Sequence, residues 1–399
     1  MYLIWYNIRI NSRFAFTKDY ITMNSPFQYG KLASGNNSIN RLSEKQKIKN
    51  QLYSGTNTIL VSPRRWGKSS LLKEVISELQ NEYSDIRVCY MDVFTIRSEW
   101  EFYLQFAKEV IKSSSTSWES WITTATEFLK PLSPRISIGS DPHNDFSIGI
   151  EVKNLIGNEH VILSLPEKVA QEQGIKIIIC MDEFQNLVKL KGYSALEKNM
   201  HHSWQNQQKI CFCICASKSY MMQEIFQSLT SPLFLEGELI RLQKIEEEDW
   251  VQYIIDSFKR TGKFISKILA SKIVQKVKNH SWYVQQFSHI IWILTSNNVS
   301  DIIYNEAFNE LIITNLPIFK RECEALTASQ INLLIAIANN EKSLTAGAVM
   351  IKYELGTPQN VSKNKALLQK RDLIEKNRDV YVLLDPVFEQ WFIREYLHD

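Results

Sequence analysis

Four short apolar runs constrain the fold of this chain more than any other feature of its sequence. The runs are rich in Ile, Val and Cys, and polar residues do not alternate with apolar ones inside them. This pattern is typical of strands that are buried on both faces of a parallel sheet. Helical patterns such as Leu71–Leu79 separate the runs, so repeated strand–helix–strand units and an α/β fold are predicted. The expected strands are Thr58–Val61, Arg87–Val93, Ile175–Asp182 and Ile210–Ala216.

The charge balance and the cysteines exclude several classes of protein. The 399 residues carry 46 Lys+Arg and 43 Asp+Glu, a net charge of +3, which excludes a chain that is polybasic throughout and an acidic disordered chain. Six cysteines are too few for a disulfide scaffold. Cys211, Cys213 and Cys215 alternate along one expected strand and are predicted to be buried thiols on one face, which favours a cytoplasmic location. Since no run of 18 apolar residues occurs, no transmembrane helix and no membrane partner are expected.

Changes of pattern along the chain predict four parts. An apolar extension comes first, and because Met23 opens a more usual start, residues 1–22 could lie upstream of the native start. The strand–helix pattern is interrupted once by alternating residues around a polar tip, which indicates a β-hairpin insertion. A helical segment and a mixed tail follow. The expected parts are residues 1–24, 25–240 with the hairpin at about 131–157, 241–320, and 321–399.

The first expected strand leads into a candidate phosphate-binding loop. Gly67, Lys68 and Ser69 open an amphipathic helix, where backbone N–H groups and the helix dipole bind anions. Lys68 can reach the β- and γ-phosphates, and the Ser69 hydroxyl can bind Mg²⁺. Ser62 stands where the usual pattern has its first Gly, and it is expected either to crowd a phosphate or to alter the loop's dihedral angles. The expected nucleotide contacts in the loop are Pro63, Arg64, Arg65, Trp66, Gly67, Lys68, Ser69 and Ser70.

Polar residues at the ends of three further strands are candidates for the same site, because the carboxyl ends of parallel strands meet at a ligand-binding edge. Asp182 is expected to hold Mg²⁺ together with Ser69, and Glu183 to orient and deprotonate the attacking water. An acidic pair that merely begins a helix is the alternative. Ser217 is either a contact to the γ-phosphate or the attacking water, or a plain loop serine. Asp92 is a further candidate for the Mg²⁺ shell.

These motifs resemble those of the prokaryotic AAA+/STAND-like P-loop ATPases of the archaeal-type ATPase group, and the similarity spans roughly residues 25–395. The resemblance implies a RecA/AAA+-like parallel sheet core, a helical lid, a C-terminal winged-helix domain, and ATP rather than GTP. The matching segments are the loop Pro63–Leu71, the strand end Asp182–Gln185, the N-terminal segments Pro26–Gly30 and Asn40–Glu44, and the lid motif His280–Gln285.

The lid motif departs from the family pattern. Asn279 and Ser281 stand where the family has Gly and Pro, and that Pro lies against the adenine in STAND-type relatives. By resemblance, His280 either senses the phosphate or completes the packing of the lid. Trp282 and Tyr283 are interpreted as core aromatics rather than as base-stacking residues.

Two loop arginines leave two interpretations open. Arg64 and Arg65 could act as arginine fingers, although such fingers usually come from another subunit or element. A structural or nucleotide-sensing role, with pairing to Asp92 or to the lid, is favoured.

The tail has the pattern of a winged helix. Thr357 is an expected N-cap and Pro358 the first residue of the helix that winged-helix proteins use for recognition. From Leu326 onward the charges cancel, but residues 356–378 hold six basic and two acidic residues, a local +4. That face could bind DNA; a protein partner, self-association or intramolecular docking is the alternative. The expected elements are helices Leu326–Asn339, Ala346–Tyr353 and Gln359–Lys370, a hairpin Asp372–Leu384, and a helix from Pro386.

The sequence therefore predicts an ATP-binding P-loop ATPase. Hydrolysis is expected to be slow, to depend on Mg²⁺, and to act as a switch that moves the winged-helix tail. Two alternatives remain: a DNA-binding regulator that nucleotide tunes, and an ATP-binding scaffold that does not hydrolyse its nucleotide.

Overall fold

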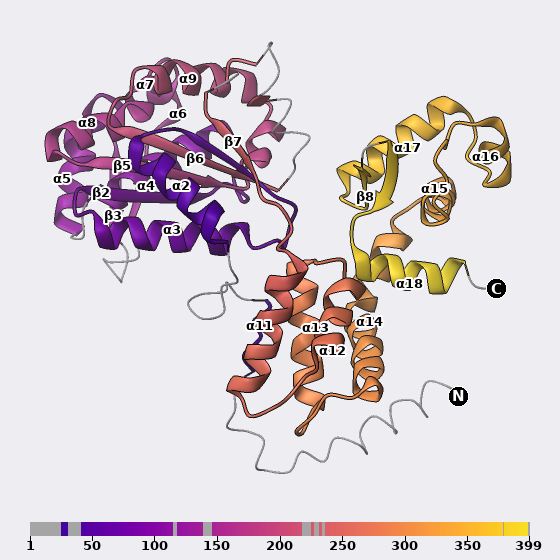
Figure 1. The fold of residues 1–399 in the computed structure, drawn as a ribbon. Helices are drawn as coiled ribbons and strands as arrows, with labels where there is room; N and C mark the ends of the chain where they lie inside the picture. The colour runs from indigo at the N-terminus through magenta and orange to yellow at the C-terminus, as the bar shows by residue number, and fades with distance from the viewer. Residues whose placement is uncertain are drawn as a thin grey trace. The chain divides into compact units, whose positions relative to one another are not determined.

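The computed structural model describes residues 25–30, 41–114, 118–138, 146–217, 225–226, 231–233, 236–377 and 379–397. The chain divides into two compact units (Figure 1). One unit comprises residues 32–245, and the other comprises residues 246–399 together with the N-terminal residues to 31. The predicted four-part boundaries are finer than this division and stay a prediction.

A five-stranded sheet forms the centre of the first unit. Its order is β2-β5-β6-β1-β7, and every pairing is parallel. The four predicted strands are confirmed, whereas the edge strand β7 was missed. Its four residues bury only Ile240 fully, so they lack the continuous apolar run of a central strand. The bounds are β1 Thr58–Val61, β2 Ile86–Asp92, β5 Lys176–Asp182, β6 Ile210–Ala216 and β7 Glu238–Arg241.

Helices cover both faces of this sheet (Figure 1). Alternate residues of each central strand enter two separate apolar clusters, one with α2 and α3 and the other with α4, α5 and α7–α9. Cys211, Cys213 and Cys215 all lie in the α2–α3 cluster as buried free thiols, which confirms their predicted placement. The helices are α2 Leu42–Ser54, α3 Lys68–Glu82, α4 Glu99–Ser114, α5 Trp118–Phe128, α6 Val152–Leu155, α7 Glu159–Leu163, α8 Leu165–Gln173 and α9 Tyr193–Gln205, with 3₁₀ turns η3 Lys130–Leu132 and η4 Phe184–Lys189.

The predicted hairpin insertion is present. Strands β3 (Arg135–Ile138) and β4 (Phe146–Gly149) pair antiparallel, with Arg135 opposite Gly149. Strand β4 ends at Gly149, and α6 begins at Val152. The polar tip, residues 139–145, lies outside the described residues.

The second unit contains the helical segment and the winged helix. Thr357 caps α17 by accepting a hydrogen bond from the Asn360 N–H at 3.3 Å, and Pro358 is the first helical residue, as predicted. Strands β8 and β9 form the predicted wing, although residue 378 at its turn lies outside the described residues. The elements are α11 Glu247–Arg260, α12 Lys267–Lys276, α13 Ser281–Leu294, α14 Asp301–Glu324, α15 Ala328–Ala338, α16 Gly347–Lys352, α17 Pro358–Lys370, β8 Ile374–Asn377, β9 Val380–Leu383 and α18 Pro386–Tyr396.

Buried contacts join helices α11–α14, which the resemblance predicts to be the lid, to the winged helix. Tyr283 of α13 is fully buried and donates a hydrogen bond to Asp385 at 2.5 Å, which confirms it as a core aromatic. The second carboxylate oxygen of Asp385 caps α18 by accepting two backbone N–H bonds at 2.9 Å. Phe319 of α14 stacks on Trp391 of α18, with ring centroids 5.6 Å apart. The lid and the tail therefore share one core.

None of the described helices is both long and apolar enough to cross a membrane.

Candidate nucleotide-binding site

The loop between β1 and α3 is shaped by the backbone of Gly67. This residue is the N-cap of α3 and has φ 92° and ψ 11°, in the left-handed region that residues with a side chain rarely adopt. Arg65 also has a positive φ, 66°. The loop thus turns sharply and places Lys68 and Ser69 in the first turn of α3, where backbone N–H groups are available to an anion.

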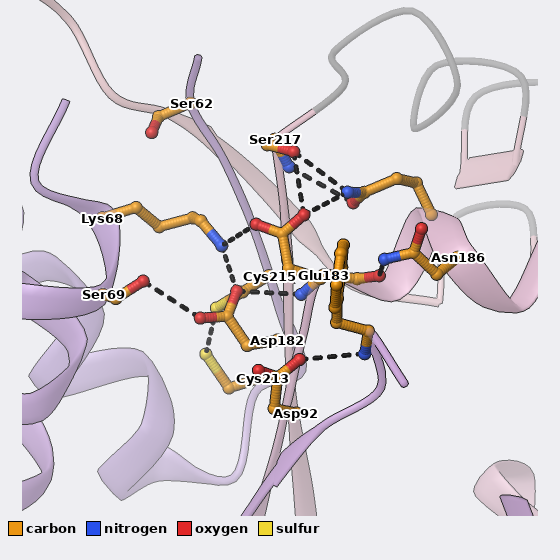
Figure 2. Close-up of polar contacts among 12 residues, drawn as sticks. Ser62, Lys68, Ser69, Asp92, Asp182, Glu183, Asn186, Cys213, Cys215 and Ser217 are labelled. Atoms are coloured by element: carbon orange, nitrogen blue, oxygen red, sulfur yellow. Dashed lines mark hydrogen bonds and ion pairs between the residues drawn. The ribbon is translucent and has the colours of Figure 1, made fainter. Parts of the chain in front are cut away.

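Lys68 and Asp182 form the centre of the site (Figure 2). The Lys68 ammonium contacts Asp182 Oδ1 and lies 3.8 Å from Glu183 Oε1. Only 6% of Lys68 and 5% of Asp182 are exposed. Two opposite charges are thereby withdrawn from water together, and either one alone would be costly to bury. The predicted meeting of the loop with the end of β5 is what the structure shows.

Asp182 accepts three further hydrogen bonds. They come from the Ser69 hydroxyl at 3.0 Å, the Tyr90 hydroxyl at 2.9 Å and the Glu183 N–H at 2.9 Å. Burial alone would raise the pKa of Asp182, yet Lys68, the Tyr90 hydroxyl and the Glu183 N–H hold that pKa below its ordinary value. Burial likewise opposes the charge on Lys68, but Cys215, Asp182 and Glu183 around it raise the pKa of its ammonium. Both groups are therefore charged at neutral pH.

Glu183 lies beside this pair and contacts a second polar group. Its backbone is left-handed, with φ 57° and ψ 36°, where β5 turns into η4. Its Oε2 accepts hydrogen bonds from the Ser217 hydroxyl at 3.0 Å and from the Gln185 amide at 2.5 Å. The structure thus brings three predicted site residues, Lys68, Glu183 and Ser217, close together (Figure 2).

The structure bears on two positions that the sequence left open, Ser62 and Asp92. Ser62 is buried, its φ is not positive, and its hydroxyl donates to the Pro63 carbonyl at 3.1 Å. The position therefore does not need the conformational freedom of glycine. Asp92 pairs in register with Asp182, but its carboxylate accepts the Phe94 N–H at 2.9 Å and is exposed. Its role in a metal shell stays a prediction.

Arg41 holds the phosphate-binding loop in place through a hydrogen bond to its backbone, a role that the sequence did not predict. Its guanidinium donates to the Trp66 carbonyl at 3.1 Å, to the Gln243 carbonyl at 3.0 Å and to Glu44 at 3.0 Å. Arg41 is buried, and burial lowers the pKa of its guanidinium, with Glu44 acting in the opposite direction. The partners are 25 and 202 residues away in sequence, so no local pattern signals the contact.

The remaining residues that were predicted to contact nucleotide differ in their exposure to solvent. Arg64 and Arg65 are exposed, while Pro63, Trp66 and Ser70 are half-buried. The Trp66 ring lies under the Lys244 ammonium, 5.6 Å from it. His280 belongs to the second unit, where it is buried with its ring 4.8 Å from that of Tyr283. Its contact with nucleotide stays a prediction, as do the roles of the loop residues.

The donors at the centre of the site fit a magnesium ion. Mg²⁺ prefers hard oxygen ligands and is usually held by one or two protein groups together with phosphate oxygens and water. The Ser69 hydroxyl and the Asp182 carboxylate are two such groups, already 3.0 Å apart. Within the described residues no group of three or more His, Cys, Asp or Glu is arranged around a metal position. A Mg²⁺ ion held by Ser69 and Asp182 would therefore take its remaining ligands from phosphate oxygens and water.

The parallel sheet, the Gly67–Ser69 helix start and the two adjacent carboxylates at the end of β5 define a P-loop ATPase. The family described as "ATPase domain predominantly from Archaea" matches residues 39–267, and the chain belongs to this family. A second description, "Probable winged helix domain", matches residues 317–394. The predicted family, fold class and winged-helix tail are thereby confirmed, and the protein is an ATP-binding P-loop ATPase by family.

Two solved structures have a similar fold. A Walker-type ATPase of Pyrococcus abyssi superposes with a TM-score of 0.65 at 16% identity, covering 92% of this chain and 99% of that one. The ORC2 protein of Aeropyrum pernix, solved as ADPNP–ADP complexes, superposes with a TM-score of 0.55 at 14% identity, covering 93% and 99%. At such identities the likeness shows the fold alone. No curated protein sequence matches significantly.

We expect Ser62→Gly to leave ATP affinity within about twofold of the wild type, because glycine relieves no strain at a negative φ. Gly67→Ala should weaken binding about tenfold, since a side chain in the left-handed region costs roughly 1–2 kcal/mol. Titration with a fluorescent ATP analogue measures both. A tenfold gain for Ser62→Gly would mean that the serine hinders phosphate.

Proposed function

We propose that this protein hydrolyses ATP slowly with Mg²⁺ and uses the nucleotide as a conformational switch. The observation that carries the proposal is the contact of buried Lys68 with buried Asp182, with half-buried Ser69 and Glu183 beside them. This cluster combines a cation for phosphate, two oxygen ligands for a divalent ion, and a carboxylate that can accept a proton.

The side chains would share the reaction as follows. Lys68 exchanges Asp182 for the β- and γ-phosphates, and the first N–H groups of α3 bind phosphate oxygens. Ser69 and Asp182 hold Mg²⁺, which supplies neutralisation of the phosphate charge. Glu183 Oε1 accepts a proton from water as the water oxygen bonds to the γ-phosphorus. The bond from that phosphorus to the bridging oxygen breaks, and ADP leaves with that electron pair.

We expect Lys68→Ala to lower ATP affinity at least tenfold, because it removes the cation that pairs with phosphate and leaves Asp182 buried without its partner. Glu183→Gln should retain affinity and lose about 10²-fold or more in turnover, the usual contribution of a general base. Phosphate release with and without EDTA measures turnover, and nucleotide titration measures affinity.

Glu197→Gln is the matched control for the glutamate change. Glu197 also accepts a hydrogen bond from a serine hydroxyl, that of Ser231 at 2.7 Å, but it is more buried than Glu183 and lies on α9, apart from the loop. Its variant should hydrolyse ATP like the wild type. A wild type that binds ATP yet turns over no faster than Glu183→Gln would establish the scaffold alternative instead.

The switch would act through Arg41. This residue holds the Trp66 carbonyl of the phosphate loop and the Gln243 carbonyl of the segment that leads from β7 to α11. If the loop moves when nucleotide binds, Arg41 would transmit that movement to the segment between β7 and α11, which leads to the second unit. Because lid and tail share one core in that unit, we propose that they move together.

We expect Arg41→Ala to bind ATP and yet to lose most of the nucleotide-dependent change in distance between the two units, because the hydrogen bonds to the Trp66 and Gln243 carbonyls are lost. Fluorescence energy transfer between dyes on α9 and α16 measures that change. Arg87→Ala is the control, since Arg87 also donates to backbone carbonyls, those of Ser84 and Ile86, but on β2. An undiminished change in Arg41→Ala would contradict the coupling.

DNA binding by the winged helix is a second candidate function. Of the basic residues on the predicted face, Lys363, Lys370, Arg371 and Lys376 are exposed in the structure. Arg371 pairs with Glu322 at 3.1 Å, and Lys365 lies over the Tyr381 ring at 5.2 Å. The three exposed lysines could contact phosphates. Whether the partner is DNA, a protein or a second copy stays a proposal.

If DNA binds there, the logarithm of the affinity should fall with the logarithm of salt concentration with a slope of about −3, since each phosphate contact contributes roughly −0.9. Lys363→Ala should reduce that slope by about one. Lys342→Ala, an exposed lysine elsewhere in the tail, should not change it. Absence of binding to duplex DNA at low salt would exclude this candidate.

A cytoplasmic location is retained as a proposal. All six cysteines are buried free thiols in the structure. Thiols persist in reducing compartments such as the cytoplasm.

A further inference from the structure

The two carboxylate oxygens of Glu183 have different surroundings. Oε2 accepts hydrogen bonds from the Gln185 amide at 2.5 Å and from the Ser217 hydroxyl at 3.0 Å. Oε1 faces the Lys68 ammonium at 3.8 Å, on the side of the phosphate loop (Figure 2). One oxygen is thus held by two donors, while the other is presented to the place where phosphate and water would lie.

The orientation of the Gln185 amide follows from its partners. Its oxygen accepts the Ser217 backbone N–H at 3.3 Å, and a backbone N–H can only donate. The amide nitrogen must therefore face Glu183, whose carboxylate can only accept. The same nitrogen lies 2.9 Å from the Ser217 hydroxyl, and so it directs the hydroxyl hydrogen toward Glu183. Gln185 is fully buried, so water cannot replace these bonds.

A general base needs this kind of restraint. Proton transfer requires the accepting oxygen to lie within hydrogen-bond reach of the water in a fixed direction. The Glu183 side chain extends from a left-handed backbone position and has three rotatable bonds, so its direction must be set by its contacts. Gln185 and Ser217 supply the contacts that set it.

We propose that Gln185 is a positioning residue for ATP hydrolysis: together with Ser217 it clamps Glu183 Oε2, so that Oε1 is the atom that takes the proton from the attacking water. This inference rests on the proposed hydrolysis and adds a residue to it. Gln185 touches neither phosphate nor water; it acts through Glu183.

The test compares kcat, KM and directly measured ATP affinity in Gln185→Met and Gln185→Glu. Gln185→Met removes both donors at similar volume and should lower kcat about tenfold. Gln185→Glu places an acceptor of like charge against Glu183 and should lower kcat about 100-fold. KM and affinity should stay within about twofold in both, because the phosphate contacts are intact.

Gln51 offers a matched control at the opposite end of the strands. It is also buried, donates from its amide to a carboxylate, that of Glu238, and accepts a hydrogen bond, from Thr58. Gln51→Met and Gln51→Glu should keep the wild-type kcat even where they lower the unfolding temperature. A fall in kcat that merely follows the fall in unfolding temperature across all four variants would overturn the proposal.

Variants of Ser217 test the clamp a second time, and this test stands even if one of the Gln185 variants fails to fold. Ser217→Thr keeps the hydroxyl and should restore most of the kcat that Ser217→Ala loses. Since Ser217 and Gln185 hold the same oxygen, Ser217→Ala combined with Gln185→Met should cost less than the product of the two single losses. Independent, multiplicative losses would contradict a shared clamp.

The outcomes separate the two proposals. If wild type hydrolyses ATP and Glu183→Gln does not, but Gln185→Met retains full kcat, the hydrolysis stands and the clamp is overturned. A rise in kcat for Gln185→Met would also overturn it, because the contacts would then restrain Glu183 away from water. If wild type itself shows no hydrolysis above Glu183→Gln, both proposals fall.

Discussion

The buried contact between Lys68 and Asp182 is the interaction on which the rest of the site depends. Each charge is withdrawn from water and would be costly alone, so each requires the other or an equivalent partner. The requirement fixes three elements at once: the loop after β1, the first turn of α3, and the end of β5. It also gives the site its chemistry, because a lysine already paired with an anion can exchange that anion for a phosphate.

The residues around this contact form two groups: those that bind Asp182 and those that bind Glu183. Asp182 accepts hydrogen bonds from Ser69, Tyr90 and the Glu183 N–H, and so it holds the proposed metal ligand Ser69 and the proposed general base Glu183 in one place. Glu183 in turn is held by Gln185 of η4 and by Ser217, the residue that follows β6. Substitution of Tyr90, Ser217 or Gln185 is therefore expected to change the rate of hydrolysis through its effect on Asp182 or Glu183.

Much of the fold was predictable because its strands carry a strong signal. Strands β1, β5 and β6 are buried on both faces, and continuous apolar runs identify them. Strand β7 escaped because an edge strand of four residues buries one side chain fully. Lys68, Ser69, Asp182 and Glu183 were predictable because their positions follow from strand ends and a helix start. Arg41, Tyr90 and Gln185 were not assigned roles, since their contacts depend on packing between segments that are distant in sequence.

A structure of the protein with Mg²⁺ and a non-hydrolysable ATP analogue would test the central claim most directly, through the position of the Lys68 ammonium. The proposed exchange predicts that Lys68 leaves Asp182 for the β- and γ-phosphate oxygens, while Ser69 and Asp182 face the metal and Glu183 keeps its contacts with Ser217 and Gln185. A bound nucleotide with Lys68 still on Asp182 would contradict it.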